Sequence, residues 1–104
     1  MATEVAVINA TSGLPVFYST YAAARAAASP GDKIQIWANL TNQQILLKDQ
    51  VDVWIAPGRI IDMGLDMPTI QDDDSVTCNV YGYGIIKNSY NPSSTGDHYE
   101  CIRI

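Results

Sequence analysis

The sequence predicts a small all-β domain built as a solenoid of about three to four coils, with one α-helix covering its N-terminal end. Two observations predict this class. An alanine-rich segment at residues 18–32 ends in a Pro-Gly pair, as a short helix does. After it, short apolar runs with the alternation of β-strands recur at intervals of about 17–25 residues, with no helices between them. Such spacing is typical of stacked repeats.

The helix is predicted at residues 18–29. Six of these residues are alanine, which has the highest helix propensity of all residues. Ser19 or Thr20 can cap the first turn with a side-chain oxygen, and the Pro-Gly pair that follows residue 29 ends the helix. At helical spacing, one face carries an aromatic ring and then small side chains, which suits close packing on a flat surface. The residues of this face are Tyr21, Ala24 and Ala28.

One strand is expected before the helix, at residues 4–9, followed by a turn at residues 11–13. Residues 14–17 are expected to lead into the helix. The chain, residues 1–104, is interpreted as a single domain whose coils occupy residues 34–104. The strands expected in these coils are 34–37, 45–47, 51–55, 60–61, 76–80, 84–87 and 99–104.

The phase of these strands indicates which positions repeat. Residues 34–38 and 51–55, seventeen apart, share the order apolar, polar, apolar, Trp, apolar. Alternate residues of 76–80 and of 102–104 can occupy the same inward positions. A β-sandwich of hairpins would also contain many short strands. It would require tight hairpin turns such as Asn-Gly, and the sequence has none. The spacing therefore favours the solenoid.

Composition excludes several classes of function. The 104 residues are 47% hydrophobic and 16% charged, as in an ordinary folded domain. The net charge is −5 and the six lysines and arginines are scattered, so we expect no nucleic-acid partner. No apolar run approaches the roughly 20 residues that span a bilayer, so no membrane insertion is expected. The N-terminal segment lacks the apolar core of a signal peptide.

Residues 18–58 resemble a known family. The stretches SPGDKIQIW and QQILLKDQVDVWIAPG, with RIID after them, are similar to the start of right-handed parallel β-helix proteins of the pectin-lyase-like superfamily. They most resemble the N-terminal part of phage tail-spike and tail-fibre β-helices. The resemblance implies a right-handed parallel β-helix in which the helix at residues 18–29 lies across the open end of the first coil. It covers about forty residues well and the rest of the chain loosely.

The same resemblance implies a function. It suggests a structural, assembly-forming module of a phage tail spike or fibre, located in the virion or outside the cell without a signal peptide. The alternative is a carbohydrate-binding or polysaccharide-degrading β-helix, or a fragment of one, because the superfamily includes lyases and glycosidases. The predicted three to four coils are few for the long cleft of such an enzyme. We therefore expect no catalytic activity and no cofactor.

Residues that could carry chemistry are few. Asp72, Asp73 and Asp74 could offer oxygen ligands to Ca²⁺, but consecutive acids in one turn point in different directions, and a solvated turn is the favoured interpretation. Paired aspartates such as Asp49 and Asp52, or Asp62 and Asp66, could in principle hydrolyse a glycosidic bond. The single histidine, His98, excludes a histidine-rich metal site. Cys78 and Cys101 lie about one coil apart in the predicted stack and could approach disulfide range. Alternation places Cys78 inward and Cys101 outward, so two free, partly buried thiols are the favoured interpretation.

The aromatic residues are the stronger candidates. If alternate residues of each strand point inward, then Trp37 and Trp54 point outward on neighbouring coils and stack. Tyr81 and Tyr83 fall on the outside in the same way. A patch of exposed aromatic side chains marks a contact surface. Contact with a protein partner, cover by the chain's own loop at residues 88–97, and binding of sugar rings are the three interpretations of this patch.

Self-association is the expected form of such contact. The N-terminal end of the predicted stack has a helix to cover it, whereas residues 102–104 form an apolar strand with no helix, proline or run of charges after them. Strand edges of this kind are prone to further pairing. We therefore expect a homo-oligomer, with a trimer favoured by the resemblance to tail spikes, and a polysaccharide as the alternative partner.

Overall fold

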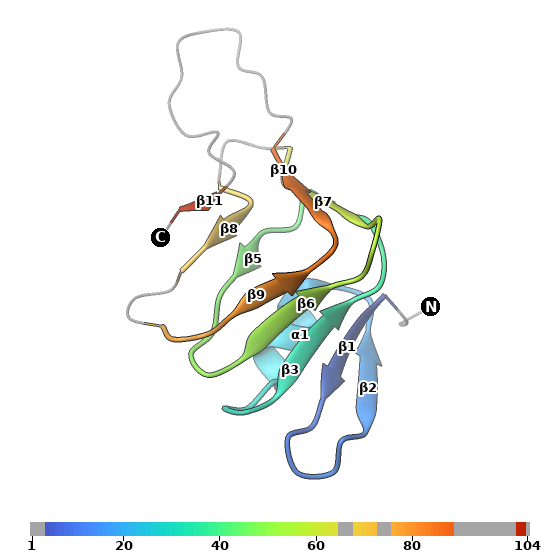
Figure 1. The fold of residues 1–104 in the computed structure, drawn as a ribbon, viewed down its shortest axis with the longest axis vertical. Coiled ribbons are helices and arrows are strands. Elements are labelled where there is room, and N and C mark those ends of the chain that lie inside the picture. The colour runs from blue at the N-terminus through green and yellow to red at the C-terminus, as the bar shows by residue number, and fades with distance from the viewer. Residues whose placement is uncertain (1–3, 65–67, 73–75, 89–101, 104) are drawn as a thin grey trace, which may run out of the picture.

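The computed structural model describes residues 4–64, 68–72, 76–88 and 102–103. Within these residues the chain forms one α-helix, α1 (Tyr21–Ala27), and eleven short strands in three sheets (Figure 1). The strands are β1 (Val5–Ile8), β2 (Pro15–Tyr18), β3 (Lys33–Ile36), β4 (Leu40–Thr41), β5 (Ile45–Leu46), β6 (Asp52–Ile55), β7 (Ile60–Asp62), β8 (Ile70–Gln71), β9 (Val80–Gly82), β10 (Ile85–Lys87) and β11 (Ile102–Arg103).

The largest sheet has five strands in the order β2-β1-β3-β6-β9 and is mixed. Strand β1 pairs antiparallel with both β2 and β3, whereas β3, β6 and β9 pair in parallel. The other two sheets are parallel and have three strands each, in the orders β10-β7-β4 and β11-β8-β5. Figure 1 shows α1 lying behind β3 and β6.

The predicted fold class, a short right-handed parallel β-helix of three to four coils with a capping helix, is therefore wrong. The structure is a small mixed-sheet domain in which antiparallel and parallel pairings meet at β3. The parallel pairs join strands that are three apart in chain order, such as β3 with β6 and β6 with β9, and they account for the repeats seen in the sequence. However, the spacing of repeats predicts only strands that pair in parallel. It does not predict β1 and β2, which pair antiparallel in the largest sheet.

The β1–β2 hairpin is the element that the sequence analysis missed. Residues 14–17 were expected to lead into the helix, yet β2 pairs along its whole length with β1. The connection is closed by Asn9, whose side-chain oxygen accepts hydrogen bonds from the backbone N–H groups of Thr11 (2.9 Å) and Ser12 (2.8 Å). Gly13 then takes a positive φ of 72°, which glycine adopts without strain. The hairpin thus turns without an Asn-Gly pair.

The strand register also differs from the expected one. Ile34 pairs with Val53 and Ile36 with Ile55, an offset of nineteen residues instead of seventeen. Because successive side chains of a strand point to opposite faces, a shift of two residues leaves every side chain on its expected face. Val53 in turn pairs with Val80 in β9. Val76, Cys78 and Val80 are partly buried against the core, as expected.

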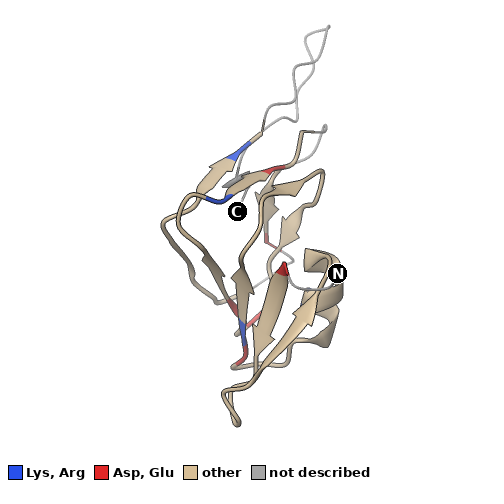
Figure 2. Cartoon of the chain, turned by 90° about the vertical axis from the view of Figure 1, so that its right-hand side faces the viewer, with Lys and Arg blue, Asp and Glu red and all other residues tan. Residues whose placement is uncertain are grey.

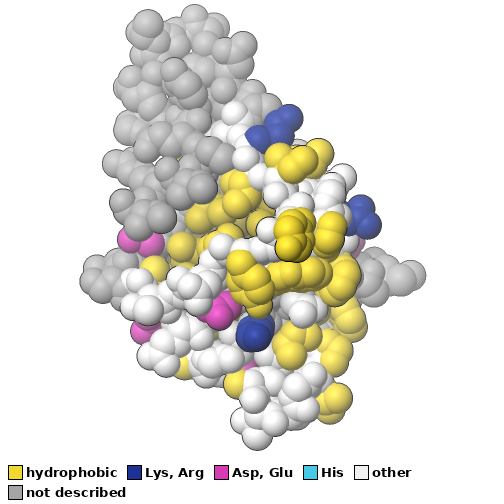
Figure 3. All heavy atoms as spheres, in the orientation of Figure 1, with side chains coloured by type: hydrophobic (Ala, Val, Ile, Leu, Met, Phe, Trp, Pro, Cys, Tyr) yellow, Lys and Arg dark blue, Asp and Glu magenta, His cyan; other side chains and the backbone are white. Residues whose placement is uncertain are grey.

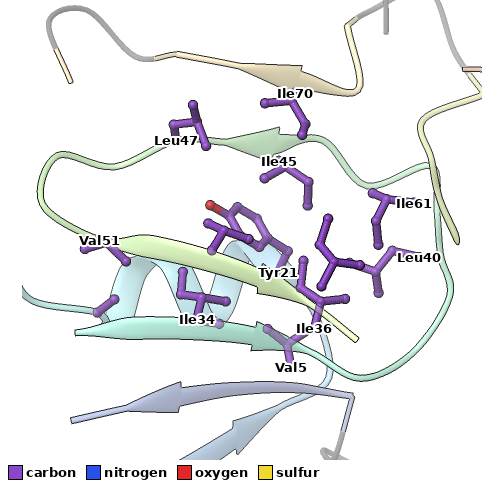
Figure 4. Close-up of a cluster of buried hydrophobic side chains, with 14 of the residues drawn as sticks. Val5, Tyr21, Ile34, Ile36, Leu40, Ile45, Leu47, Val51, Ile61 and Ile70 are labelled. Carbon is purple, nitrogen blue, oxygen red and sulfur yellow. The ribbon is translucent and has the colours of Figure 1, made fainter. Parts of the chain in front are cut away.

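The hydrophobic core lies between the inner faces of the sheets and α1 (Figure 4). Alternate residues of β1, β3 and β6 enter it, and α1 contributes Tyr21 and Ala24, each no more than 1% exposed. The largest fully buried apolar side chains are Tyr21, Ile34, Ile36, Ile45, Ile61, Ile70, Val5, Val51 and Val53. In β3 and β6 the buried residues alternate with exposed or half-buried ones on the opposite face, whereas in β1 Ala6 is buried as well as Val5 and Val7.

Both ends of α1 are capped by side chains. The hydroxyl of Thr20 accepts a hydrogen bond from the N–H of Ala23 (3.2 Å), so one of the two expected caps is observed. At the other end the Lys48 ammonium donates to the carbonyl oxygens of Ala28 (2.6 Å) and Arg25 (2.9 Å). A cation at the helix C-terminus also favours the helix dipole. The helix is shorter than the predicted 18–29 because these caps delimit it.

Tyr21 fixes α1 to the sheet of β5, since its hydroxyl donates to the Leu46 carbonyl oxygen (2.8 Å). Burial raises the pKa of this hydroxyl well above its ordinary value near 10, although the charge of Arg25 acts in the opposite direction. Because the pKa of Tyr21 is higher in the folded state than in the unfolded state, its un-ionised hydroxyl contributes its full stabilisation at any pH below the unfolded-state pKa. This contribution is lost as the pH rises above about 10.

We expect the free energy of unfolding of the wild-type protein to fall steeply above pH 10, and Tyr21→Phe to flatten this fall. The variant should be less stable at pH 7 by about 1 kcal/mol, because it loses one hydrogen bond. Urea unfolding at pH 8, 10 and 11 measures both effects. Parallel pH profiles of the two proteins would contradict the assignment, and Tyr83→Phe, at an exposed position, is the control.

Candidate functional site

The outer face of the five-stranded sheet is the candidate site. The strand register places one residue of each strand side by side across it: Phe17 beside Ala6, Ala6 beside Gln35, Gln35 beside Trp54, and Trp54 beside Tyr81. Phe17, Gln35, Trp54 and Tyr81 alternate with residues that face the core, so their side chains point away from it. Ala6, between Phe17 and Gln35, is buried, with 1% of its surface exposed. This face of the sheet therefore carries three aromatic rings in register, two of them together at Trp54 and Tyr81.

Two further aromatic residues extend this row. Trp37 follows β3 directly, and Tyr83 follows β9 in the turn toward β10. Phe17, Trp37 and Tyr81 are each 44% exposed and Tyr83 is 83% exposed, while Trp54 is half-buried. In Figure 3 hydrophobic side chains form a band across this side of the molecule. We call Phe17, Trp37, Trp54, Tyr81 and Tyr83 the aromatic face.

The two tryptophans are in contact. Their ring centroids are 4.9 Å apart and their planes are inclined at 63°, an edge-to-face arrangement that is favourable for aromatic pairs. The Trp37 indole N–H also donates to the Gln35 side-chain oxygen at 3.1 Å. Trp54 therefore contacts Trp37 and lies beside Tyr81 in the strand register, and the two indole rings are not coplanar.

All four predicted contact residues, Trp37, Trp54, Tyr81 and Tyr83, lie in the described part of the chain. The structure brings Trp37 and Trp54 together and sets Tyr81 beside Trp54 in register. Their role in binding stays a prediction. The sequence analysis missed Phe17, since residues 14–17 were not expected to form a strand. The alternation of Val16, Phe17 and Tyr18 was the signal that could have identified it.

The acidic residues are weaker candidates for a functional site than the aromatic residues. Asp72 is half-buried, and Asp73 and Asp74 lie outside the described residues, so the proposed calcium turn is not tested. Among residues that the structure does describe, no group of three or more His, Cys, Asp or Glu side chains could hold a metal ion.

Asp49 and Asp52 have structural hydrogen bonds. Their carboxylates accept from the backbone N–H groups of Thr77 (2.8 Å) and Asn79 (2.9 Å), which lie in the segment before β9. Of the second candidate pair, Asp66 lies outside the described residues. The arrangement of Asp49 and Asp52 explains their presence without catalysis, because each of them satisfies a backbone donor of the next strand segment.

Cys78 is a half-buried free thiol. Burial raises its pKa above the ordinary thiol value, and the nearby carboxylates of Asp52 and Asp49 raise it further. A thiol of this kind is a poor nucleophile at neutral pH because little of it is ionised. Cys101 and His98 lie outside the described residues.

A cleft of about 470 Å³ lies between α1 and residues 42–46. Its size is that of a small-molecule pocket. Its polar groups, however, are engaged in holding the fold together. The Gln43 side-chain oxygen accepts from the Tyr21 N–H (2.9 Å), and Arg25 donates to the carbonyl oxygens of Leu46 (2.8 Å) and Leu47 (3.1 Å).

Acidic and basic residues are interspersed along the described chain (Figure 2). Within the described residues no helix has the length and apolar character needed to cross a membrane. Comparison of the chain with protein-family models, curated proteins and solved structures finds no match. The support for the candidate site is therefore the arrangement of its residues in the structure.

Proposed function

We propose that this chain is a structural module that joins a larger protein assembly through its aromatic face. The observation that supports this function is the group of aromatic side chains on one face of the five-stranded sheet, of which Phe17, Trp37 and Tyr81 are each 44% exposed and Tyr83 is 83% exposed. Aromatic residues are enriched in the cores of protein interfaces, where charged residues are depleted. None of the five residues of the aromatic face is charged.

The shape of the face favours a protein over a sugar as the partner. Flat polysaccharide surfaces suit coplanar rings, whereas Trp37 and Trp54 are inclined to each other at 63°. A cleft of about 470 Å³ lies beside α1, away from the aromatic face, whereas the small cleft of about 120 Å³ that Tyr81 lines is formed otherwise by aliphatic residues and glycines. An irregular aromatic surface of this kind fits side chains of a partner, which can interdigitate with it.

We propose that this assembly is part of a virion. The sequence resembles phage tail-spike and tail-fibre proteins at residues 18–58, and those proteins form the adhesion apparatus of the particle. In this proposal the chain contributes structure and contact surface to that apparatus and performs no catalysis. Carbohydrate binding by Trp37 and Trp54 is the alternative, and it is supported by the exposed ring surface of Trp37, which is 44% exposed.

A dilution series separates the two functions. We expect the average mass of the wild-type protein in sedimentation equilibrium to rise with concentration, and Trp54→Ser to reduce association at least tenfold, as for a central interface residue. The matched control is Thr41→Ser, a polar and exposed position on a different sheet. A protein that stays monomeric at every concentration and is retained by immobilised polysaccharide through Trp37 would contradict the assembly function.

A further inference from the structure

We infer that the free edge of β9 and the small cleft beside it bind an extended segment of a partner protein, which adds to the five-stranded sheet as one more strand. The segment carries an aliphatic side chain that enters the cleft next to Gly82. This contact lies at the edge of the sheet and is separate from the aromatic face, so it goes beyond the function proposed above.

Strand β9 is the last strand of the five-stranded sheet, and β6 is its one partner among the described strands. The Asn79 carbonyl oxygen accepts from an N–H of β6 (2.9 Å), and the Tyr83 N–H donates to a carbonyl oxygen of β6 (3.3 Å). Tyr81 lies two residues from each of them and faces β6 in the same way. The N–H groups of Val80 and Gly82 therefore point toward the free edge.

A free edge of this kind pairs readily with an extended backbone. Peptide recognition by strand addition uses these unpaired N–H and C=O groups for affinity and neighbouring pockets for specificity. Edge strands are commonly protected by proline or by charged side chains. The opposite edge strand, β2, begins with Pro15. The three residues of β9, Val80–Gly82, include neither a proline nor a charge.

The neighbouring strands indicate which side chain the added segment carries. Ile36 of β3 lies beside Ile55 of β6 in register, and Ile55 lies beside Gly82 of β9. Ile36 and Ile55 are 0% and 2% exposed, so both fill the core at this level. Gly82 has no side chain to continue them. An aliphatic side chain on a strand beyond β9 can continue this inward column.

A cleft of about 120 Å³ lies at this point of the sheet. Its volume is close to that of an apolar cavity of about 150 Å³ that accepts a benzene molecule. Val80 and Ile86 are only partly buried here, so an added apolar side chain removes more of their surface from water. The described lining is uncharged and consists of Ile55, Val80, Tyr81, Gly82, Gly84 and Ile86. The cleft therefore fits an aliphatic side chain better than a charged one.

Amide hydrogen exchange, followed by NMR, tests the free edge in the protein alone. The Tyr81 N–H is bonded to β6 and should exchange slowly. The N–H groups of Val80 and Gly82 should exchange at least about tenfold faster, because water reaches them directly. Slow exchange of all three groups in dilute protein would show that the edge is already covered, and it would overturn the inference.

The probe for strand addition is a synthetic peptide of residues 31–36 of this chain, blocked at both ends. It contains the β3 sequence, which forms a parallel pair in this sheet, and it has no aromatic residue. At saturation it should slow exchange at Val80 and Gly82 at least about tenfold and leave Tyr81 unchanged. The matched control is the same peptide with Ile36→Ala.

The control peptide should bind at least about tenfold more weakly, because it lacks most of the apolar group that enters the cleft. Equal affinity of the two peptides, or no protection by either, would overturn the inference. Protection of Val80 and Gly82 that rises with protein concentration in the absence of peptide would also overturn it, because the occupant would then be a second copy of this chain.

Two variants of the full chain locate the contact. Val80→Pro removes an N–H of the free edge but no hydrogen bond to β6, and it should weaken peptide binding at least about tenfold. Circular dichroism checks that it folds. Trp54→Ser should bind the peptide as the wild type does, so the edge and the aromatic face are tested separately. Loss of peptide binding in Trp54→Ser would place the peptide on the aromatic face and overturn the inference.

Discussion

Replacement of Ala24 by glutamate is expected to unfold the domain. Ala24 is fully buried on the inner face of α1, where the helix packs against β1, β2, β3 and β5. A carboxylate at this position would have to lose its hydration without a partner, which costs several kcal/mol. The total stability of a small domain is only about 5–15 kcal/mol. We therefore expect an insoluble protein, or one without a cooperative thermal transition.

The same substitution one residue earlier is the matched control. Ala23 is exposed, and its N–H already bonds to the Thr20 hydroxyl. Ala23→Glu creates a capping box with Thr20 and adds a negative charge at the helix N-terminus, both of which are favourable by a few tenths of a kcal/mol to about 1 kcal/mol. Thermal unfolding followed by circular dichroism compares the two variants. A soluble Ala24→Glu protein with the wild-type melting temperature would show that α1 does not cover the core.

The sequence predicts which side chains of a strand point inward better than it predicts which residues of the neighbouring strand they pair with. Trp37 and Trp54 were expected on the outside, and they are, although the register of β3 with β6 is shifted by two residues from the expected one. The period of a strand is two, so a shift by two residues conserves the inward and outward positions. Burial of alternate residues thus follows from local pattern, whereas register depends on the lengths of the connections.

The fold class could not be predicted, because it depends on β1 and β2. Their hairpin is closed by the Asn9 side chain and by Gly13 in the left-handed region, and no short sequence motif distinguishes this loop from an ordinary polar turn. If the hairpin is not recognised, residues 15–18 are not predicted to pair with another strand. The spacing between the later strands then favours a purely parallel stack, so a mixed sheet is not predicted.

The candidate site was predicted in part for the same reason. Tyr81 and Tyr83 follow from alternation after Val80, as Trp37 and Trp54 do after their own apolar neighbours. Phe17 joins this face of the sheet only through the antiparallel pairing of β2 with β1 and of β1 with β3, which the spacing of the parallel strands does not reveal.

The second large effect that we expect is a loss of stability on substitution of Gly82, the last residue of β9. Gly82 has a φ of 122°, a conformation available in practice only to glycine. Its backbone lies directly on Ile55 of the neighbouring strand. A Cβ atom at position 82 would overlap the Ile55 carbonyl oxygen and lie 2.9 Å from the Ile55 nitrogen. These atoms belong to the backbone of β6, so they cannot move aside as a flexible side chain could.

Gly82→Ala should therefore lower the free energy of unfolding by about 3 kcal/mol or more, from backbone strain of about 1–3 kcal/mol and from the displacement of β9 against β6. Gly58→Ala is the matched control, since Gly58 also has a positive φ (76°) but has no atom within 4 Å of the added Cβ. Its expected loss is about 1–2 kcal/mol, the conformational term alone. Urea unfolding of both variants measures the difference. Equal losses would mean that β9 does not pack on Ile55 as closely as the structure shows, and would also remove Tyr81 from its place beside Trp54.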